Sequence, residues 1–238
     1  MTEWKAKRFW TAASVTETEG GFGVLLDARS VKTPSKAPLT VPTRNMAQAI
    51  AAEWDAQSEV IDPLTMPVTR GANAAIDKVA PMRAEVIEEL SGFGGTDLLC
   101  YRADAPEELR AKQADAWDPW LAWSANALDA PLLTGQGVMH VEQPAHSLAR
   151  LAAEVGRFDN FQLAGLHDLV ALSGSLVLAL AVTYDKLAAE EAWRLSRIDE
   201  DWQISQWGED EEAEAVARKK AEAFGNAARF FRLSSPQG

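Results

Sequence analysis

A stretch of sixteen residues without a charged side chain constrains this chain more than any other feature. It extends from Leu169 to Tyr184 and is bracketed by Asp168 and Asp185. A helix of sixteen residues rises only about 24 Å, whereas the hydrocarbon core of a bilayer is roughly 30 Å thick. We therefore predict that this stretch belongs to one helix, over residues 161–184, that is buried in protein and not in lipid.

A segment rich in tryptophan and carboxylates follows the buried stretch. Glu190 and Glu191 mark the start of an acidic helix. Apolar residues at helical spacing predict its inward face, and they are Ala192, Leu195, Ile198 and Trp202. The carboxylates Asp199, Glu200 and Asp201 are then expected to face mostly outward. A last helix is predicted over residues 213–233, with aromatic residues near its end.

The amino-terminal part of the chain has a β pattern. Residues 8–42 contain turn signals at Gly20–Gly21 and at Asp27–Ser30, and three prolines follow them. These signals predict a meander of three or four short strands. Thr43 then opens a helix, and the next helical pattern, over residues 68–90, is expected to break at Pro81.

Helical periodicity dominates the rest of the chain. Pro106 is expected to start a helix in which Trp117, Trp120 and Trp123 share one face, an arrangement more typical of core packing than of a ligand platform. A further helix is predicted over residues 144–158. The fold class is therefore α+β, with a small N-terminal β-rich α+β domain (residues 1–65), a helical connector (66–95) and a larger all-helical C-terminal domain (96–238).

Composition excludes several classes of function. The net charge is −12, which argues against binding nucleic acid or anionic lipid, because both require a basic face. The single cysteine, Cys100, excludes an internal disulfide framework and a multi-cysteine metal site. The amino terminus shows no targeting leader, so a cytoplasmic location is expected.

The sequence shows no pattern typical of catalysis. The glycines at positions 92, 94 and 95 lack the Lys-Ser/Thr ending of a phosphate loop, and His140, His146 and His167 fit no metal-binding spacing. Cys100 lies between Leu99 and Tyr101, without a thiolate-stabilising neighbour. We therefore expect no catalytic residue, no metal, no cofactor and no small-molecule substrate.

Strings along nearly the whole chain resemble one family. They are RFW (8–10), GFGVLLDARSVKTP (21–34), LTVPT (39–43), IAAEWDAQ (50–57), TDLLCYRA (96–103), QADAWDPWLAW (113–123), SGSLVLALA (173–181) and SRIDEDWQISQWGED (196–210). On these strings the chain resembles the ATP synthase assembly chaperones that handle the alpha subunit of the catalytic head, the "ATP-twelve" family. The chain departs from the family pattern in three small ways. Ala28 stands where glycine is common in the family's LDGR turn, Gly94–Gly95 replace a tyrosine-type helix end, and Ala188 stands at the cap of the acidic helix.

The resemblance implies a small α+β domain followed by a larger helical domain. It also implies a chaperone that does not use ATP. Such a protein binds the unassembled alpha subunit and covers its interface until the beta subunit replaces it. Without a leader, a bacterial, alpha-proteobacterial cytoplasm is expected, whereas eukaryotic relatives would work in the mitochondrial matrix.

Tryptophan beside acid predicts where such a partner would bind. The first candidate surface is the acidic C-terminal region, and the second lies at the end of the helix opened by Thr43. The candidate residues are Asp199, Glu200, Trp207, Glu209, Asp210 and Glu211, and then Trp54 and Asp55. Two alternatives stay open: a hydrolase with a carboxylate pair in a cleft of the helical domain, and a small-molecule binding module.

Overall fold

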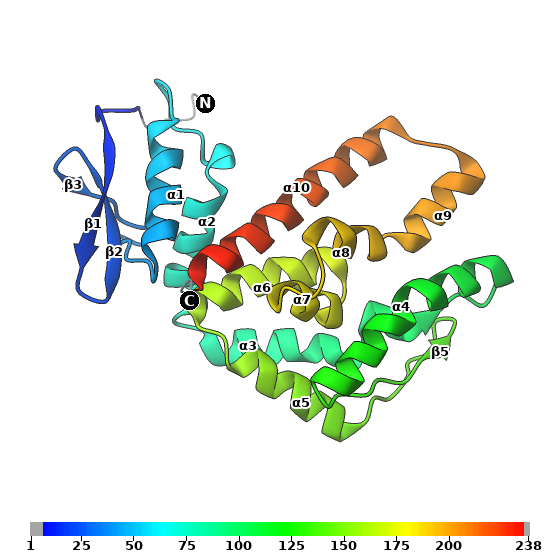
Figure 1. Cartoon of the computed structure of the whole chain (residues 1–238). Helices are drawn as coiled ribbons and strands as arrows, with labels where there is room; N and C mark the ends of the chain where they lie inside the picture. Colours follow the sequence, from blue (N-terminus) through cyan, green and yellow to red (C-terminus); the bar gives the residue numbers. More distant parts are fainter. Residues whose placement is uncertain (1–6, 236–238) are drawn as a thin grey trace. The chain divides into compact units, whose positions relative to one another are not determined.

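The computed structural model describes residues 7–235, which form two compact units (Figure 1). The first unit comprises the described residues up to Arg83, together with Asp159–Gly165 and residues 229–235. The second unit comprises Ala84–Phe158 and Leu166–Ala228. The domain boundaries predicted at residues 65 and 95 refer to parts of the chain that fold separately. The division into compact units does not test this, so these boundaries stay a prediction.

An antiparallel sheet of three strands begins the first unit. Its strands β1 (Ala13–Thr18), β2 (Gly21–Leu26) and β3 (Arg29–Ser30) lie in sequence order (Figure 1). The turn between β1 and β2 contains Gly20 at a φ of 86°, which glycine adopts without steric cost. The meander predicted from the turn signals is confirmed.

The helix α1 (Arg44–Asp55) packs against the sheet. Thr43 accepts a hydrogen bond from the backbone N–H of Met46 and so caps the helix, as predicted. The fully buried side chains of Met46 and Ile50 lie on the inward face of α1. The carboxylate of Glu53 accepts hydrogen bonds from the N–H groups of Val68 and Thr69, in the first turn of α2 (Pro67–Ala74).

Short helical segments connect α2 to the rest of the chain. The segment η1 (Pro63–Thr65) precedes α2, the π-helical segment η2 (Ala75–Val79) follows it, and α3 (Arg83–Gly92) begins after a turn. Pro81 lies in that turn, so the predicted break is confirmed. The 3₁₀ segments η3 (Phe93–Gly95) and η4 (Leu98–Cys100) come next.

The second unit is mainly helical. A minimal parallel sheet pairs β4 (Tyr101–Arg102) with β5 (Gly135–Gln136), on either side of α4 in the sequence. The helices that follow β4 in the chain are α4 (Glu107–Ala127), α5 (Ala145–Gly156), α6 (Asn160–Ser173), α7 (Leu176–Thr183), α8 (Ala189–Leu195), α9 (Ile198–Trp207) and α10 (Glu211–Ser234). The second unit contains α6 only from Leu166 onward and α10 only as far as Ala228. The fold class predicted from the sequence, α+β with a helical C-terminal region, is confirmed.

The uncharged stretch is buried, but the prediction of one helix is wrong. The helix α6 ends at Ser173, Gly174 adopts a φ of 69°, and α7 begins after Ser175. The hydroxyl of Ser175 accepts from the N–H of Leu178 and caps α7. All residues of α7 from Leu176 to Ala181 have zero exposure. Within residues 7–235, each helix is too short or too polar to cross a membrane.

The acidic helix is also divided. It was expected as one element, but α8 ends at Leu195 and α9 begins at Ile198. The hydroxyl of Ser196 donates to the carbonyl of Trp193 at 2.8 Å, which closes the end of α8. The last helix, α10, agrees with its predicted bounds to within two residues at the start and one at the end.

Candidate partner-binding site

Eight carboxylates and no lysine or arginine lie between residues 199 and 214. We call residues 199–214 the acidic corner, because they comprise α9 from its second residue, the turn after it and the start of α10 (Figure 1). Gly208, at a φ of 90°, ends α9. The carboxylate of Asp210 then caps α10 by accepting from the N–H groups of Glu212 and Ala213, both at 2.9 Å.

Most of the predicted residues of the acidic corner are exposed. Trp207 has 81% of its surface exposed, and Glu200, Glu209, Asp210 and Glu211 are also exposed. An indole exposed to this degree has little to pack against within the second unit. Aromatic side chains of this kind are enriched among the anchors of protein interfaces.

Asp199 differs from its neighbours. It is half-buried, and its carboxylate accepts a hydrogen bond of 2.6 Å from the side-chain amide of Gln113. The expectation that Asp199 faces outward therefore holds only in part. Its main contact fixes the first turn of α9 against α4.

The helix α4 supports the acidic corner through two residues four apart. Gln113 bonds Asp199, and the indole N–H of Trp117 donates to the carbonyl of Leu195 at 2.8 Å. Gln113 and Trp117 are each only 1% exposed. Residues four apart on a helix lie on the same face, so one face of α4 holds both the end of α8 and the start of α9.

Arg197 is the basic residue nearest in sequence to the acidic corner. Its guanidinium lies 3.9 Å from the carboxylate of Glu200 and 3.8 Å from that of Asp201. It also lies over the ring of Trp193, at 5.4 Å from the centroid. Because exposed ion pairs contribute only about 0–1 kcal/mol, these long contacts leave the two carboxylates free to meet a partner's cations.

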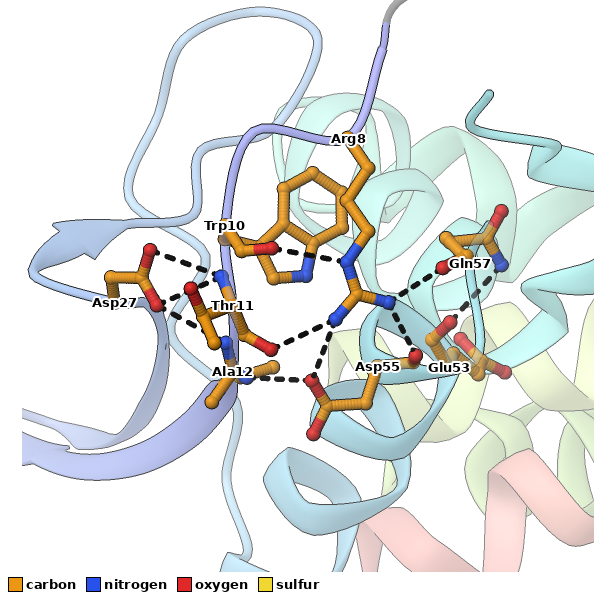
Figure 2. Close-up of polar contacts among 9 residues, drawn as sticks. Arg8, Trp10, Thr11, Ala12, Asp27, Glu53, Asp55 and Gln57 are labelled. Atoms are coloured by element: carbon orange, nitrogen blue, oxygen red, sulfur yellow. Dashed lines mark hydrogen bonds and ion pairs between the residues drawn. The ribbon is translucent and has the colours of Figure 1, made fainter. Parts of the chain in front are cut away.

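The second group of predicted residues, Trp54 and Asp55, belongs to the first unit. Figure 2 shows the polar contacts of Asp55. The ring of Trp54 meets that of Trp10 edge to face, with the centroids 5.2 Å apart. The carboxylate of Asp55 accepts from the N–H of Ala13 at 2.7 Å and lies 3.8 Å from the guanidinium of Arg8. Both side chains therefore hold the amino-terminal segment against α1. A partner-binding role for them stays a prediction.

Arg8 completes this arrangement. Its guanidinium donates to four backbone carbonyls, those of Trp10, Thr11, Asp55 and Gln57 (Figure 2). A guanidinium has no acceptor and a fixed fork of donors, so it suits a position where several carbonyls converge. The end of α1 is thereby tied to the segment that leads into β1.

Sequence reasoning missed Asp97, the most deeply buried carboxylate of the described residues. It has zero exposure, and it accepts from the N–H of Leu99 at 3.0 Å, the N–H of Val177 at 2.9 Å and the hydroxyl of Ser175 at 2.8 Å. Burial raises the pKa of the Asp97 carboxyl. Its oxygens are directed at the start of α7 and not at solvent, so Asp97 has a structural role that no sequence motif indicated.

Cys100 lies close to Asp97 and is also buried. Burial, followed by the charge of Asp97, raises the pKa of the Cys100 thiol to about 12. A thiol with this pKa carries almost no thiolate near neutral pH, and the thiolate is the nucleophilic form. The expectation that Cys100 is not poised as a nucleophile agrees with this environment.

The three histidines lie in separate local contacts. His140 contacts the hydroxyl of Tyr101, His146 contacts Asp129 at 3.0 Å, and His167 contacts its neighbour Asp168 at 3.3 Å. Among the residues that the structure describes, no group of three or more histidine, cysteine or acidic side chains is placed to hold a metal ion.

Comparison with known proteins identifies the family. The family model described as "ATP12 chaperone protein" matches residues 7–125. The protein atp12, mitochondrial, of Schizosaccharomyces pombe is 27% identical over 223 residues, which cover 88% of this chain and 76% of that protein.

Solved structures agree closely with this fold. The crystal structure of Atp12 from Paracoccus denitrificans is 52% identical, covers 98% of this chain and 100% of that chain, and has a TM-score of 0.95. An aspartate-to-lysine mutant of P. denitrificans Atp12p matches with the same coverage and TM-score at 51% identity. The Atu1473 protein of Agrobacterium tumefaciens is 44% identical, covers 96% of this chain and 85% of that chain, and has a TM-score of 0.91. The chain therefore belongs to the ATP12 chaperone family, the ATP synthase assembly chaperones that its sequence strings resemble.

Proposed function

We propose that the chain binds the unassembled alpha subunit of the ATP synthase and shields its interface until the beta subunit replaces the chaperone. Family membership supports a role in assembly, and the resemblance of the sequence strings supports the alpha subunit as the partner. The observation that carries the proposal is the acidic corner, where the exposed Trp207 stands among carboxylates and no lysine or arginine. A bacterial cytoplasm is the location that fits this role.

The acidic corner suits a partner surface that is apolar and bordered by basic residues. The exposed indole of Trp207 would be buried as an anchor, while Glu200, Glu209 and Glu211 would attract arginine or lysine. Charge complementarity of this kind mainly speeds association and excludes wrong partners.

The chaperone needs no nucleotide for this action. An isolated subunit exposes a large apolar interface, which favours aggregation. A binder that covers this interface stabilises the free subunit by RT ln(1 + [L]/Kd), a mass-action effect. Replacement by the beta subunit then requires only that the final interface be larger or more apolar than the chaperone contact.

The alternative, a hydrolase, predicts two converging carboxylates with raised pKa values. Burial raises the pKa of the Asp97 carboxyl, as this alternative would require of a catalytic acid. Its oxygens are already bonded to Leu99, Ser175 and Val177 within the core. General acid–base chemistry needs a group that reaches the substrate. Residues 7–235 thus offer no observation that favours the hydrolase, and we propose a non-enzymatic role.

The direct test is binding to purified alpha and beta subunits, each kept separate, by calorimetry or co-purification. We expect the wild-type chain to bind the alpha subunit and not the beta subunit. Trp207→Ala should weaken this binding by about thirtyfold or more, because a buried tryptophan anchor contributes on the order of 2 kcal/mol. Glu209→Lys should weaken binding of the alpha subunit more at low salt than at high salt, because salt screens the lost charge interaction.

A matched control separates the acidic corner from overall charge. Glu19→Lys makes the same charge change at an exposed turn in the first unit and should leave binding unchanged. Glu209 is preferred to Glu211 because a lysine at 211, in the first turn of α10, also opposes the helix dipole by about 0.3–1 kcal/mol. Equal weakening by the Glu19 and Glu209 variants would contradict the assignment of the surface, and wild-type binding to beta instead of alpha would contradict the proposed partner.

A further inference from the structure

A second exposed apolar feature lies on the connection between α4 and α5. We call residues 132–141 the apolar loop, because Val138 is 98% exposed, Met139 75% and Leu133 52%. Single exposed apolar side chains are ordinary on protein surfaces, but a contiguous exposed group typically marks an interaction site. The apolar loop does not overlap the acidic corner (residues 199–214) in the sequence.

The apolar loop is tied down at several points. The side-chain amide of Gln143 pairs with the backbone of Leu133 in both directions, donating to its carbonyl at 2.9 Å and accepting from its N–H at 2.8 Å. The N–H of Gly137 donates to the carbonyl of Arg102 at 2.8 Å, beside the pairing of β4 with β5. These hydrogen bonds fix the backbone of the apolar loop. Val138 and Met139 are therefore exposed on a segment that has defined contacts.

The strand under the loop is itself anchored in the core. The guanidinium of Arg102 donates to the carbonyl of Leu99 and to the carboxylate of Asp118, and it lies 5.1 Å from the ring centroid of Trp117. Arg102 is only 7% exposed. A buried guanidinium with this set of partners fixes β4, and hence the base of the apolar loop, against α4.

One side chain connects the apolar loop to the acidic corner. The amide oxygen of Gln113 accepts from the N–H of Ala103, directly after β4, at 2.8 Å. The amide nitrogen of the same residue donates to Asp199 in α9 at 2.6 Å. The two features belong to the same compact unit, and Gln113 of α4 connects the end of β4 to the first turn of α9.

Charge around the apolar loop indicates the kind of partner. Asp104 and Glu142 are exposed beside it, and no lysine or arginine occurs between Lys112 and Arg150. A second copy of this chain would bring the same acidic surroundings to the contact and would be repelled. An apolar surface bordered by basic residues complements both the loop and the acidic corner.

We propose that the apolar loop and the acidic corner form one composite binding surface for the client subunit, positioned by Gln113. The apolar loop takes the apolar part of the subunit interface, and the acidic corner takes its basic border. This inference rests on the proposed function and adds to it a second contact on a different element. Val138 and Met139 make the contact, whereas Gln113 is a positioning residue.

The test uses the full chain with Val138→Ser and Met139→Ser combined, and measures binding to the purified alpha subunit. The two side chains are already exposed, so we expect the variant to keep the wild-type melting temperature and to lose at least tenfold in affinity. Leu64→Ser is the matched control, because Leu64 is 78% exposed in the first unit, and it should bind as the wild type does. Unchanged affinity of the double variant would overturn the proposal.

Two further measurements keep the outcomes distinct. Gln113→Leu should weaken binding of the alpha subunit although Val138 and Met139 are unchanged. If Gln113→Leu fails to fold, the affinity of the double loop variant alone tests the composite surface. Sedimentation of the wild type at increasing concentration should show no self-association through the loop. A dimer abolished by the loop substitutions would overturn the client assignment, whereas failure of the wild type to bind the alpha subunit would refute the proposed function itself.

Discussion

Replacing Asp97 by alanine tests how much of the second unit depends on one buried carboxylate. The change removes the acceptor for the N–H groups of Leu99 and Val177 and for the hydroxyl of Ser175, at a position with zero exposure. Each buried donor left without a partner costs about 1–3 kcal/mol. The hydroxyl can rotate toward another acceptor, and a buried carboxylate no longer has to be desolvated. The expected net loss in the free energy of unfolding is therefore about 3 kcal/mol.

A matched variant at an exposed site isolates the effect of burial. Asp210 also accepts from two backbone N–H groups, those of Glu212 and Ala213, but it is exposed. Asp210→Ala is expected to cost only about 1 kcal/mol, the usual value for a helix cap. Urea unfolding followed by tryptophan fluorescence measures both variants, with the m-value compared to confirm that the same transition is observed. If Asp97→Ala costs no more than Asp210→Ala, the reasoning from burial is refuted.

Three further predictions concern single side chains. The hydrogen bond to Asp168 raises the pKa of His167. The contribution of this pair to stability is therefore complete below about pH 6.5 and is lost as pH rises through the folded-state pKa of His167. An NMR titration of His167 should show a raised midpoint, which Asp168→Asn should lower. Since the pKa of Cys100 is raised to about 12, the thiol should react with a thiol reagent at pH 8 only as the chain unfolds, and fast labelling of the native protein would contradict its burial. Trp54→Arg removes an edge-to-face contact and is expected to lower the free energy of unfolding by about 2 kcal/mol, whereas an unchanged urea midpoint would contradict a structural role for Trp54.

Local signals in the sequence were sufficient where one residue controls the backbone. Thr43 caps α1 and Pro81 separates α2 from α3, because a cap and a missing N–H act within a few residues. The same local reading failed at residues 173–175. There the apolar composition is that of one continuous buried helix, but Gly174 turns the chain through a left-handed conformation.

The break at Gly174 depends on a residue far away in the sequence. Asp97 accepts from the hydroxyl of Ser175 and from the N–H of Val177, and so satisfies polar groups that the start of a buried helix would otherwise leave unpaired. The N–H of Leu98 also donates to the carbonyl of Gly174 at 3.0 Å. Contacts across about eighty positions are not visible in periodicity, which explains why the sequence predicted burial correctly and continuity incorrectly.

The acidic corner could be found in the sequence because it is a local feature of composition. Trp207 and the surrounding carboxylates are adjacent in the chain, and the structure leaves most of them exposed. The apolar loop carries no such signal, since Val138 and Met139 are ordinary residues in a connector until their exposure is known. Exposure depends on what the rest of the fold covers, and a single sequence does not contain that information.

The support of the site was the least predictable part, because it comes from Trp117, whose stripe the sequence predicts to be core, and from Gln113, for which the sequence predicts no role. Trp117 is indeed buried, as that interpretation requires. Its indole N–H nevertheless donates a hydrogen bond to the carbonyl of Leu195 at the end of α8. Gln113, one turn earlier, accepts from the N–H of Ala103 and donates to the carboxylate of Asp199. A polar side chain that is 1% exposed and hydrogen-bonded through both its amide oxygen and its amide nitrogen is costly to replace, because an apolar substitute leaves buried groups without a partner. Gln113 therefore links stability to recognition: a change there should alter the acidic corner and the apolar loop together, although neither surface contains it.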